Sequence, residues 1–134
     1  SINDMAKWLM AQMGYRPDVL AAPTLDQLHS KIIRNAVARS HYGQQPASVK
    51  TWYGLGWRVF DVGAYQNFVH HGGWVQGFRA EMVFNRELDI GMVFLTNAET
   101  RLARDVIFQF VNSYALERQN EQQLPEQMIT QSAR

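Results

Sequence analysis

The sequence has 134 residues, of which 46% are hydrophobic and 19% charged, a composition typical of one globular domain. Its formal net charge is +1, with acidic and basic residues interspersed, so nothing marks a nucleic-acid-binding or membrane-surface protein. Apolar runs are only a few residues long, too short to span a bilayer. The absence of cysteine excludes disulfides, thiolate chemistry and cysteine-ligated zinc.

The first part of the chain predicts two amphipathic helices. Residues 1–13 carry apolar side chains at helical spacing, and Ser1 and Asp4 have the spacing of an N-terminal capping box. A second capping-box spacing and a second apolar stripe predict a helix from Thr24 to about Ser40. The polar stretch after it predicts a connector.

After residue 50 the apolar period becomes that of strands. Alternating residues rich in aromatic and β-branched side chains predict strands over 52–60, 67–71, 78–85 and 90–96. Turns are expected at 61–66 and 86–89. Gly54 and Gly56 leave one face of the first strand without side chains, which suits the close approach of another element to that face. The last strand is almost wholly apolar, which indicates cover on both faces.

A strong apolar stripe over 102–114 predicts a final helix that lies on the sheet. Helices, then consecutive strands with short connections, then a helix indicate the α+β class with an antiparallel sheet and packed helices. We assign 1–118 to one domain and 119–134, which is polar and glutamine-rich, to a C-terminal tail.

The stretch 67–78 combines features of a binding site. Three glycines within six residues are expected to form a turn after the strand that ends at His71, with Trp74 between Gly72–Gly73 and the third glycine. A phosphate cradle is disfavoured, because such loops precede a helix and here a strand follows. A purely structural hairpin remains the main alternative, although a minimal hairpin does not need six residues with an indole among them.

Other residues give little independent evidence of catalysis. His70 and His71 are adjacent in a strand and point to opposite faces, and no metal-ligand spacing exists, so a metal site is disfavoured. The sequence has neither an S-x-x-K nor a G-x-S-x-G motif. Tyr65 and Asn67 match Y-x-N but are interpreted as part of a hairpin. Asn97 is favoured as a helix cap, with a polar group in the cleft as the alternative.

Four segments, in order, resemble class C β-lactamases and their penicillin-binding and esterase relatives. They are SINDMAKWL at 1–9, YGLGW at 53–57, HGGWVQGF at 71–78 and IGMVFLTN at 90–97. The third segment falls where the family has its K-[ST]-G or H-x-G motif. The resemblance extends from residue 1 to about 114 and corresponds to the C-terminal portion of such an enzyme.

The resemblance implies specific roles for this stretch. The family's nucleophilic serine and its Y-x-N tyrosine lie upstream of the portion that resembles this chain. The backbone N–H of Trp74 would be one oxyanion donor, and His71 would line the cleft. Gly72, Gly73 and Asn97 would lie at the substrate, which would be a β-lactam, a D-Ala peptide or an ester. No cofactor or metal is implied, and the expected location is the periplasm.

Two departures from the family pattern bear on the substrate. His71 stands where β-lactamases have lysine, and histidine carries no permanent positive charge. Gly72 stands where they have a hydroxyl. Both changes weaken the grip on a β-lactam carboxylate, and histidine here is more typical of peptidase- and esterase-like relatives. Arg79 is a candidate for the missing positive charge.

Two functions follow. Because the chain opens at Ser1, without methionine and already helical in pattern, we expect a piece of a longer serine hydrolase, inactive alone for lack of a nucleophile. The alternative is a non-catalytic binding or assembly module that dimerises through its exposed sheet, or associates with the missing N-terminal part.

Overall fold

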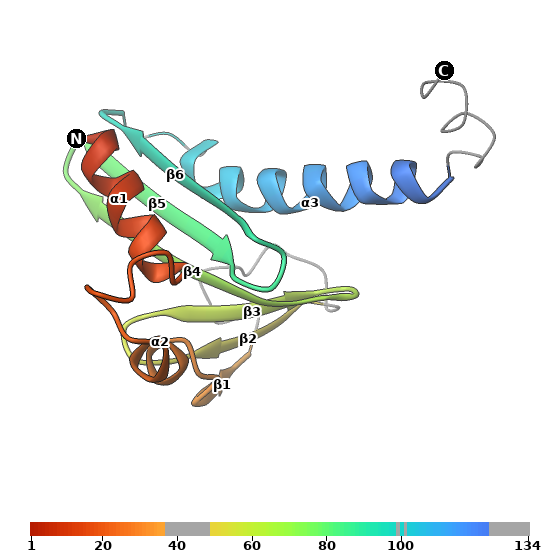
Figure 1. Ribbon diagram of the computed structural model, residues 1–134. Helices are drawn as coiled ribbons and strands as arrows, with labels where there is room; N and C mark the ends of the chain where they lie inside the picture. The colour runs from red at the N-terminus through yellow and green to blue at the C-terminus, as the bar shows by residue number, and fades with distance from the viewer. Residues whose placement is uncertain (37–48, 99, 101, 124–134) are drawn as a thin grey trace, which may run out of the picture.

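The computed structural model describes residues 1–36, 49–98, 100 and 102–123, which form an antiparallel sheet with helices on both faces (Figure 1). The strands are β1 (Ile33–Asn35), β2 (Lys50–Tyr53), β3 (Arg58–Val62), β4 (Tyr65–Val75), β5 (Phe78–Asn85) and β6 (Ile90–Thr96). The helices are α1 (Ile2–Gln12), α2 (Ala22–Leu28) and α3 (Leu102–Gln123). The six strands lie in the sheet in chain order, which confirms the predicted α+β class.

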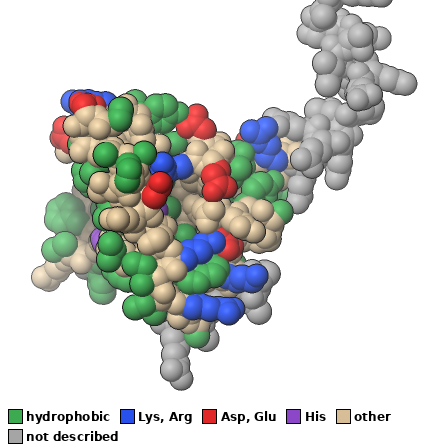
Figure 2. Space-filling model, turned by 60° about the horizontal axis from the view of Figure 1, so that its bottom comes forward, with side chains coloured by type: hydrophobic (Ala, Val, Ile, Leu, Met, Phe, Trp, Pro, Cys, Tyr) green, Lys and Arg blue, Asp and Glu red, His purple; other side chains and the backbone are tan. Residues whose placement is uncertain are grey.

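Alternation along the strands sends neighbouring side chains into two separate cores. Val83 and Phe84 are adjacent in β5, yet each is fully buried in a different core. The core under α3 contains Val49, Phe60, Phe68, Val83, Ile107, Phe108 and Val111. The core under α1 and α2 contains Trp57, Val69, Met82 and Phe84. Hydrophobic side chains also lie between acidic and basic ones on the surface drawn in Figure 2.

Helix α1 begins and packs as the sequence predicts. The Ser1 hydroxyl accepts a hydrogen bond from the Asp4 N–H, and the Asp4 carboxylate bonds back to the Ser1 amine at 3.0 Å, so the capping box is confirmed. Helix α1 lies on β6, where a Cβ added to Gly91 would come within 3.1 Å of Leu9. Because α3 contacts β6 from the other face, the predicted two-sided cover of this strand is confirmed.

The predicted second helix is too long. Helix α2 ends at Leu28, and Ile33–Asn35 forms β1, which pairs with β2; residues 37–40 lie outside the described part of the chain. The predicted capping box is also wrong, because the helix begins one turn earlier, at Ala22, without a side-chain cap. Tertiary contacts override the helical period here. The Nζ of Lys31 donates a hydrogen bond to Oδ1 of Asp61 in β3 at 2.8 Å, which holds this segment against the sheet.

The single strand predicted over 52–60 is two strands joined by a tight turn. The N–H of Gly54 donates to the carbonyl of Trp57 at 2.7 Å, and Gly56 lies between them with φ +82°. The expected close crossing is confirmed at Gly54, where an added Cβ would lie 2.7 Å from the carbonyl oxygen of Ser30.

The glycine-rich turn is the largest correction. Strand β4 continues through Gly72, Gly73 and Trp74 without a break, and the chain reverses only at Gln76–Gly77, where Gly77 has φ +80°. The turn at 86–89 is confirmed.

Helix α3 extends well beyond the predicted 102–114. It runs to Gln123, so the predicted tail boundary at 118 falls inside it, and residues 124–134 lie outside the described part. None of the described helices is both long and apolar enough to cross a membrane.

Candidate functional site

The second half of β4 borders an open edge of the sheet. Strand β4 pairs with β5 from Val69 to Val75, whereas β3 begins at Arg58, opposite His70. Within the described strands, residues 71–75 therefore have a strand partner on one side only. A strand with one free side offers its unpaired backbone groups to a ligand.

Hairpin geometry fixes which backbone groups face this edge. The two-residue turn closes the β4–β5 hairpin at the pair Val75–Phe78. The closing pair of such a hairpin is hydrogen-bonded, and bonded and non-bonded pairs then alternate. Val75 and Gly73 therefore direct their backbone groups toward β5, while Trp74 and Gly72 direct theirs toward the open edge. The indole of Trp74 is itself 66% exposed.

His71 stands at the same edge in a fixed orientation. Its Nδ1 lies 2.6 Å from the carbonyl oxygen of Gly56, and its ring meets Trp57 edge-on at 5.8 Å. A carbonyl only accepts hydrogen bonds, so Nδ1 carries the proton and Nε2 of the neutral ring keeps a lone pair. The side chain is exposed, so Nε2 can meet a ligand.

The adjacent His70 points to the opposite face, as predicted, and is fully buried. Its Nε2 lies 2.7 Å from Oε2 of Glu81, and Oε1 of Glu81 lies 3.7 Å from Arg79. Burial lowers the pKa of His70, against the opposing effect of the hydrogen bond to Glu81. The neutral ring therefore donates Nε2–H to the carboxylate.

Glu81 is a residue of this region that was not predicted from the sequence. Its alternation with Met82 in a half-buried strand places a carboxylate on a covered face, which is an unusual position that calls for a partner. Arg79, the candidate for a positive charge in the cleft, pairs instead with this buried carboxylate and lies over the ring of Trp74 at 5.5 Å.

Gly72, Gly73 and Asn97 occupy different environments. A Cβ at Gly72 would collide with the Glu81 carboxylate, whereas one at Gly73 would meet nothing within 4 Å. Asn97 is exposed just beyond β6 and lines a hollow together with Gly73, so these two are brought together. The favoured role of Asn97 as a helix cap is wrong, because α3 begins only at Leu102.

Tyr65, which matches Y-x-N in the sequence, is remote from this edge. It begins β4 as part of a hairpin, as interpreted from the sequence, and packs against Tyr114 of α3 at 5.8 Å. Among the described residues, no three His, Cys, Asp or Glu side chains converge to hold a metal ion.

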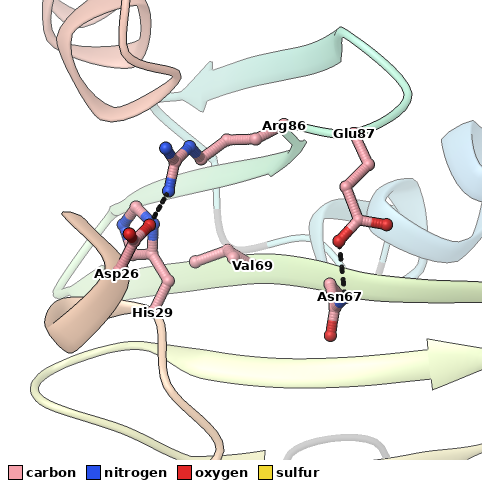
Figure 3. Close-up of a pocket in the computed structure, with 6 residues that line it drawn as sticks. All are labelled: Asp26, His29, Asn67, Val69, Arg86 and Glu87. Carbon is pink, nitrogen blue, oxygen red and sulfur yellow. Dashed lines mark hydrogen bonds and ion pairs between the residues drawn. The ribbon is translucent and has the colours of Figure 1, made fainter. Parts of the chain in front are cut away.

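A second, polar pocket of about 370 Å³ lies between α2 and the turn after β5 (Figure 3). Arg86 bonds Asp26 at 2.8 Å on one side, and Asn67 bonds Glu87 at 2.8 Å on the other. His29 bonds Gln12 through Nε2, while its buried Nδ1 has no hydrogen-bond partner. Burial lowers the pKa of His29 to about 4, helped by the charge of Arg86.

An antiparallel sheet with helices on both faces and a half-paired inner strand is consistent with the fold of β-lactamase-type serine hydrolases. A family model described as Beta-lactamase matches residues 1–113. The chain belongs to the Beta-lactamase family. No curated protein matches the sequence.

Proposed function

We propose that this chain is the C-terminal part of a serine hydrolase that works through an acyl-enzyme. The open N–H of Trp74, beside the oriented ring of His71, is the observation that carries the proposal. The 134 residues contain no S-x-x-K motif, so the nucleophile and its base come from outside this sequence. The chain alone is therefore inactive.

Each group at the edge of β4 has a defined task in this proposal. The serine attacks a carbonyl carbon, and negative charge develops on the carbonyl oxygen. The Trp74 N–H donates to that oxygen, and such a preorganised donor contributes about 10²- to 10³-fold in kcat. The Nε2 lone pair of His71 accepts a hydrogen bond from the water that hydrolyses the acyl-enzyme, and so positions that water at the carbonyl carbon.

Four features favour an ester or peptide over an anionic β-lactam. His71 supplies no permanent positive charge, and Gly72 supplies no hydroxyl. The carboxylate of Glu81 fills the space beside Gly72, and Arg79 is engaged with it. A substrate carboxylate would therefore find little to neutralise it.

The test compares the full-length gene product with this chain alone. We expect only the longer protein to hydrolyse p-nitrophenyl acetate and to react with a fluorophosphonate serine probe, with the modified serine mapped outside these 134 residues by peptide mass. Nitrocefin turnover should be slower than ester turnover. Turnover or labelling of the isolated chain would contradict the proposal.

The alternative, an assembly module, is favoured by apolar side chains at the hairpin tip. Trp74, Val75 and Phe78 are 66%, 71% and 61% exposed. Size-exclusion chromatography with light scattering separates the two. A stable dimer of the full-length product that Phe78→Ser dissociates, without any serine labelling, would support assembly over catalysis.

A further inference from the structure

The face of β4 and β5 that carries α1 has a groove beside the open edge. Two hollows, of about 370 and 580 Å³, meet at Gly73 and Ala80, and we call them together the Gly73–Ala80 groove. The first hollow has His71 at its rim. Its walls include Met5 and Trp8 of α1, together with Trp57 and Met82.

The groove exists because two small residues face each other. Gly73 and Ala80 are a cross-strand pair, so at this point neither strand raises a large side chain toward α1. A Cβ at Gly73 would meet nothing within 4 Å, so the floor of the groove is open. The combined space falls within the range of small-molecule sites in proteins.

The lining of the groove selects an apolar occupant. Thioether and aromatic side chains form most of the wall of the first hollow, and its acidic lining residue, Glu81, is bonded to the buried His70. The second hollow continues along Val75, Phe78 and Leu95, which are 71%, 61% and 40% exposed. Its polar lining residues are Thr96, Asn97 and Arg79, and Arg79 is paired with Glu81. An uncharged hydrocarbon chain would cover this surface and gain about 25 cal/mol for each Å² removed from water.

We propose that the Gly73–Ala80 groove is the subsite for the apolar acyl chain of an ester substrate. This inference rests on the proposed function, in which the substrate carbonyl binds the Trp74 N–H. Gly73 immediately precedes that donor, so a chain attached to the carbonyl carbon reaches the floor of the groove directly. The preferred substrates are esters of medium-chain acids.

The kinetic test uses the full-length gene product and p-nitrophenyl acetate, butyrate and hexanoate. We expect kcat/KM to rise by up to about fourfold for each added methylene. Ala80→Leu fills the floor and should flatten this rise, and Gly73→Ala should reduce it. Ala115→Leu makes the same change on α3, across the sheet, and should leave the profile as in the wild type. A flat wild-type profile, or a rise that both groove variants keep, overturns the proposal.

A binding test separates this inference from the proposed function. Trp8 and Trp57 line the groove, so titration of the full-length gene product with 1-hexanol should give a saturable fluorescence change that Ala80→Leu weakens at least about fivefold. If the full-length product hydrolyses no ester, the proposed function is wrong and the hexanol titration decides the groove. No saturable change, or one insensitive to Ala80→Leu, would show that another part of the protein fills the groove and would overturn the subsite.

Discussion

Glu81 fills the space that a side chain at Gly72 would need. The two residues face each other across β4 and β5, and the carboxyl carbon of Glu81 would lie 2.9 Å from a Cβ added at position 72. The carboxylate cannot swing away freely, because it is bonded to the buried His70. Gly72 thus serves the packing of the opposite face as well as the edge of the site.

We predict that Gly72→Ala destabilises the chain by about 1–3 kcal/mol, the usual cost of overpacking a close-packed site. Gly73→Ala is the matched control, because a Cβ there meets open space. It should be neutral or stabilising by roughly 0.5–1 kcal/mol. Urea denaturation measures both. Equal stability of the two variants would mean that Glu81 is not held in place.

Trp74→Pro tests the backbone donor directly. Proline lacks an N–H but is tolerated in a strand where that N–H faces an open edge, so the variant should fold. In the full-length product, kcat should fall about 10²- to 10³-fold relative to Trp74→Ala, which removes the indole and keeps the N–H. Circular dichroism checks the fold, and steady-state ester hydrolysis gives the rates. A folded proline variant as active as the alanine variant would exclude this N–H as an oxyanion donor.

His71→Ala removes the oriented imidazole from the edge. Its hydrogen bond to a reacting group should be worth roughly 10- to 100-fold in kcat/KM for ester hydrolysis. Because His71 is exposed, the unfolding midpoint in urea should change little. Unchanged kinetics in a folded variant would remove His71 from the site.

His29 should make stability depend on pH. Its folded pKa is about 4 and its unfolded value 6.5, so between these values the unfolded state binds the proton more readily. Stability therefore falls as pH drops from about 6.5 toward about 4. His29→Phe removes this term, and the slope of unfolding free energy against pH should become shallower by up to one proton. Urea titrations at pH 4.5 and 7.0 compare the slopes, and parallel wild-type and variant slopes would contradict this assignment.

Local signals predicted the fold wherever local and tertiary preferences agree. The Ser1 capping box and strands β5 and β6 follow from spacing and alternation, and the structure has them. Strand β1 was not predictable in this way, because Ile32 and Ile33 continue a helical stripe and only pairing with β2 makes that segment extended. The spacing of apolar residues does not reveal such a long-range strand partner.

Only part of the candidate site was predicted, because residue spacing carries no information on contacts with distant residues. Adjacent histidines in a strand must diverge, and His70 and His71 do. The glycines suggested a turn, because glycine is common where the chain reverses. The carboxylate that requires Gly72 comes from the next strand, and the sequence gives no distance between residues nine apart.

In the described sheet the spatial order of the strands is the same as their order in the chain, which affects how the chain folds. Each pairing joins consecutive strands, and such local contacts permit folding on the order of milliseconds once the helices dock. The β4–β5 hairpin closes over only two residues, so it can form among the earliest elements. Pairing within this hairpin fixes the direction of the Trp74 N–H, so the donor is oriented as soon as the hairpin has formed.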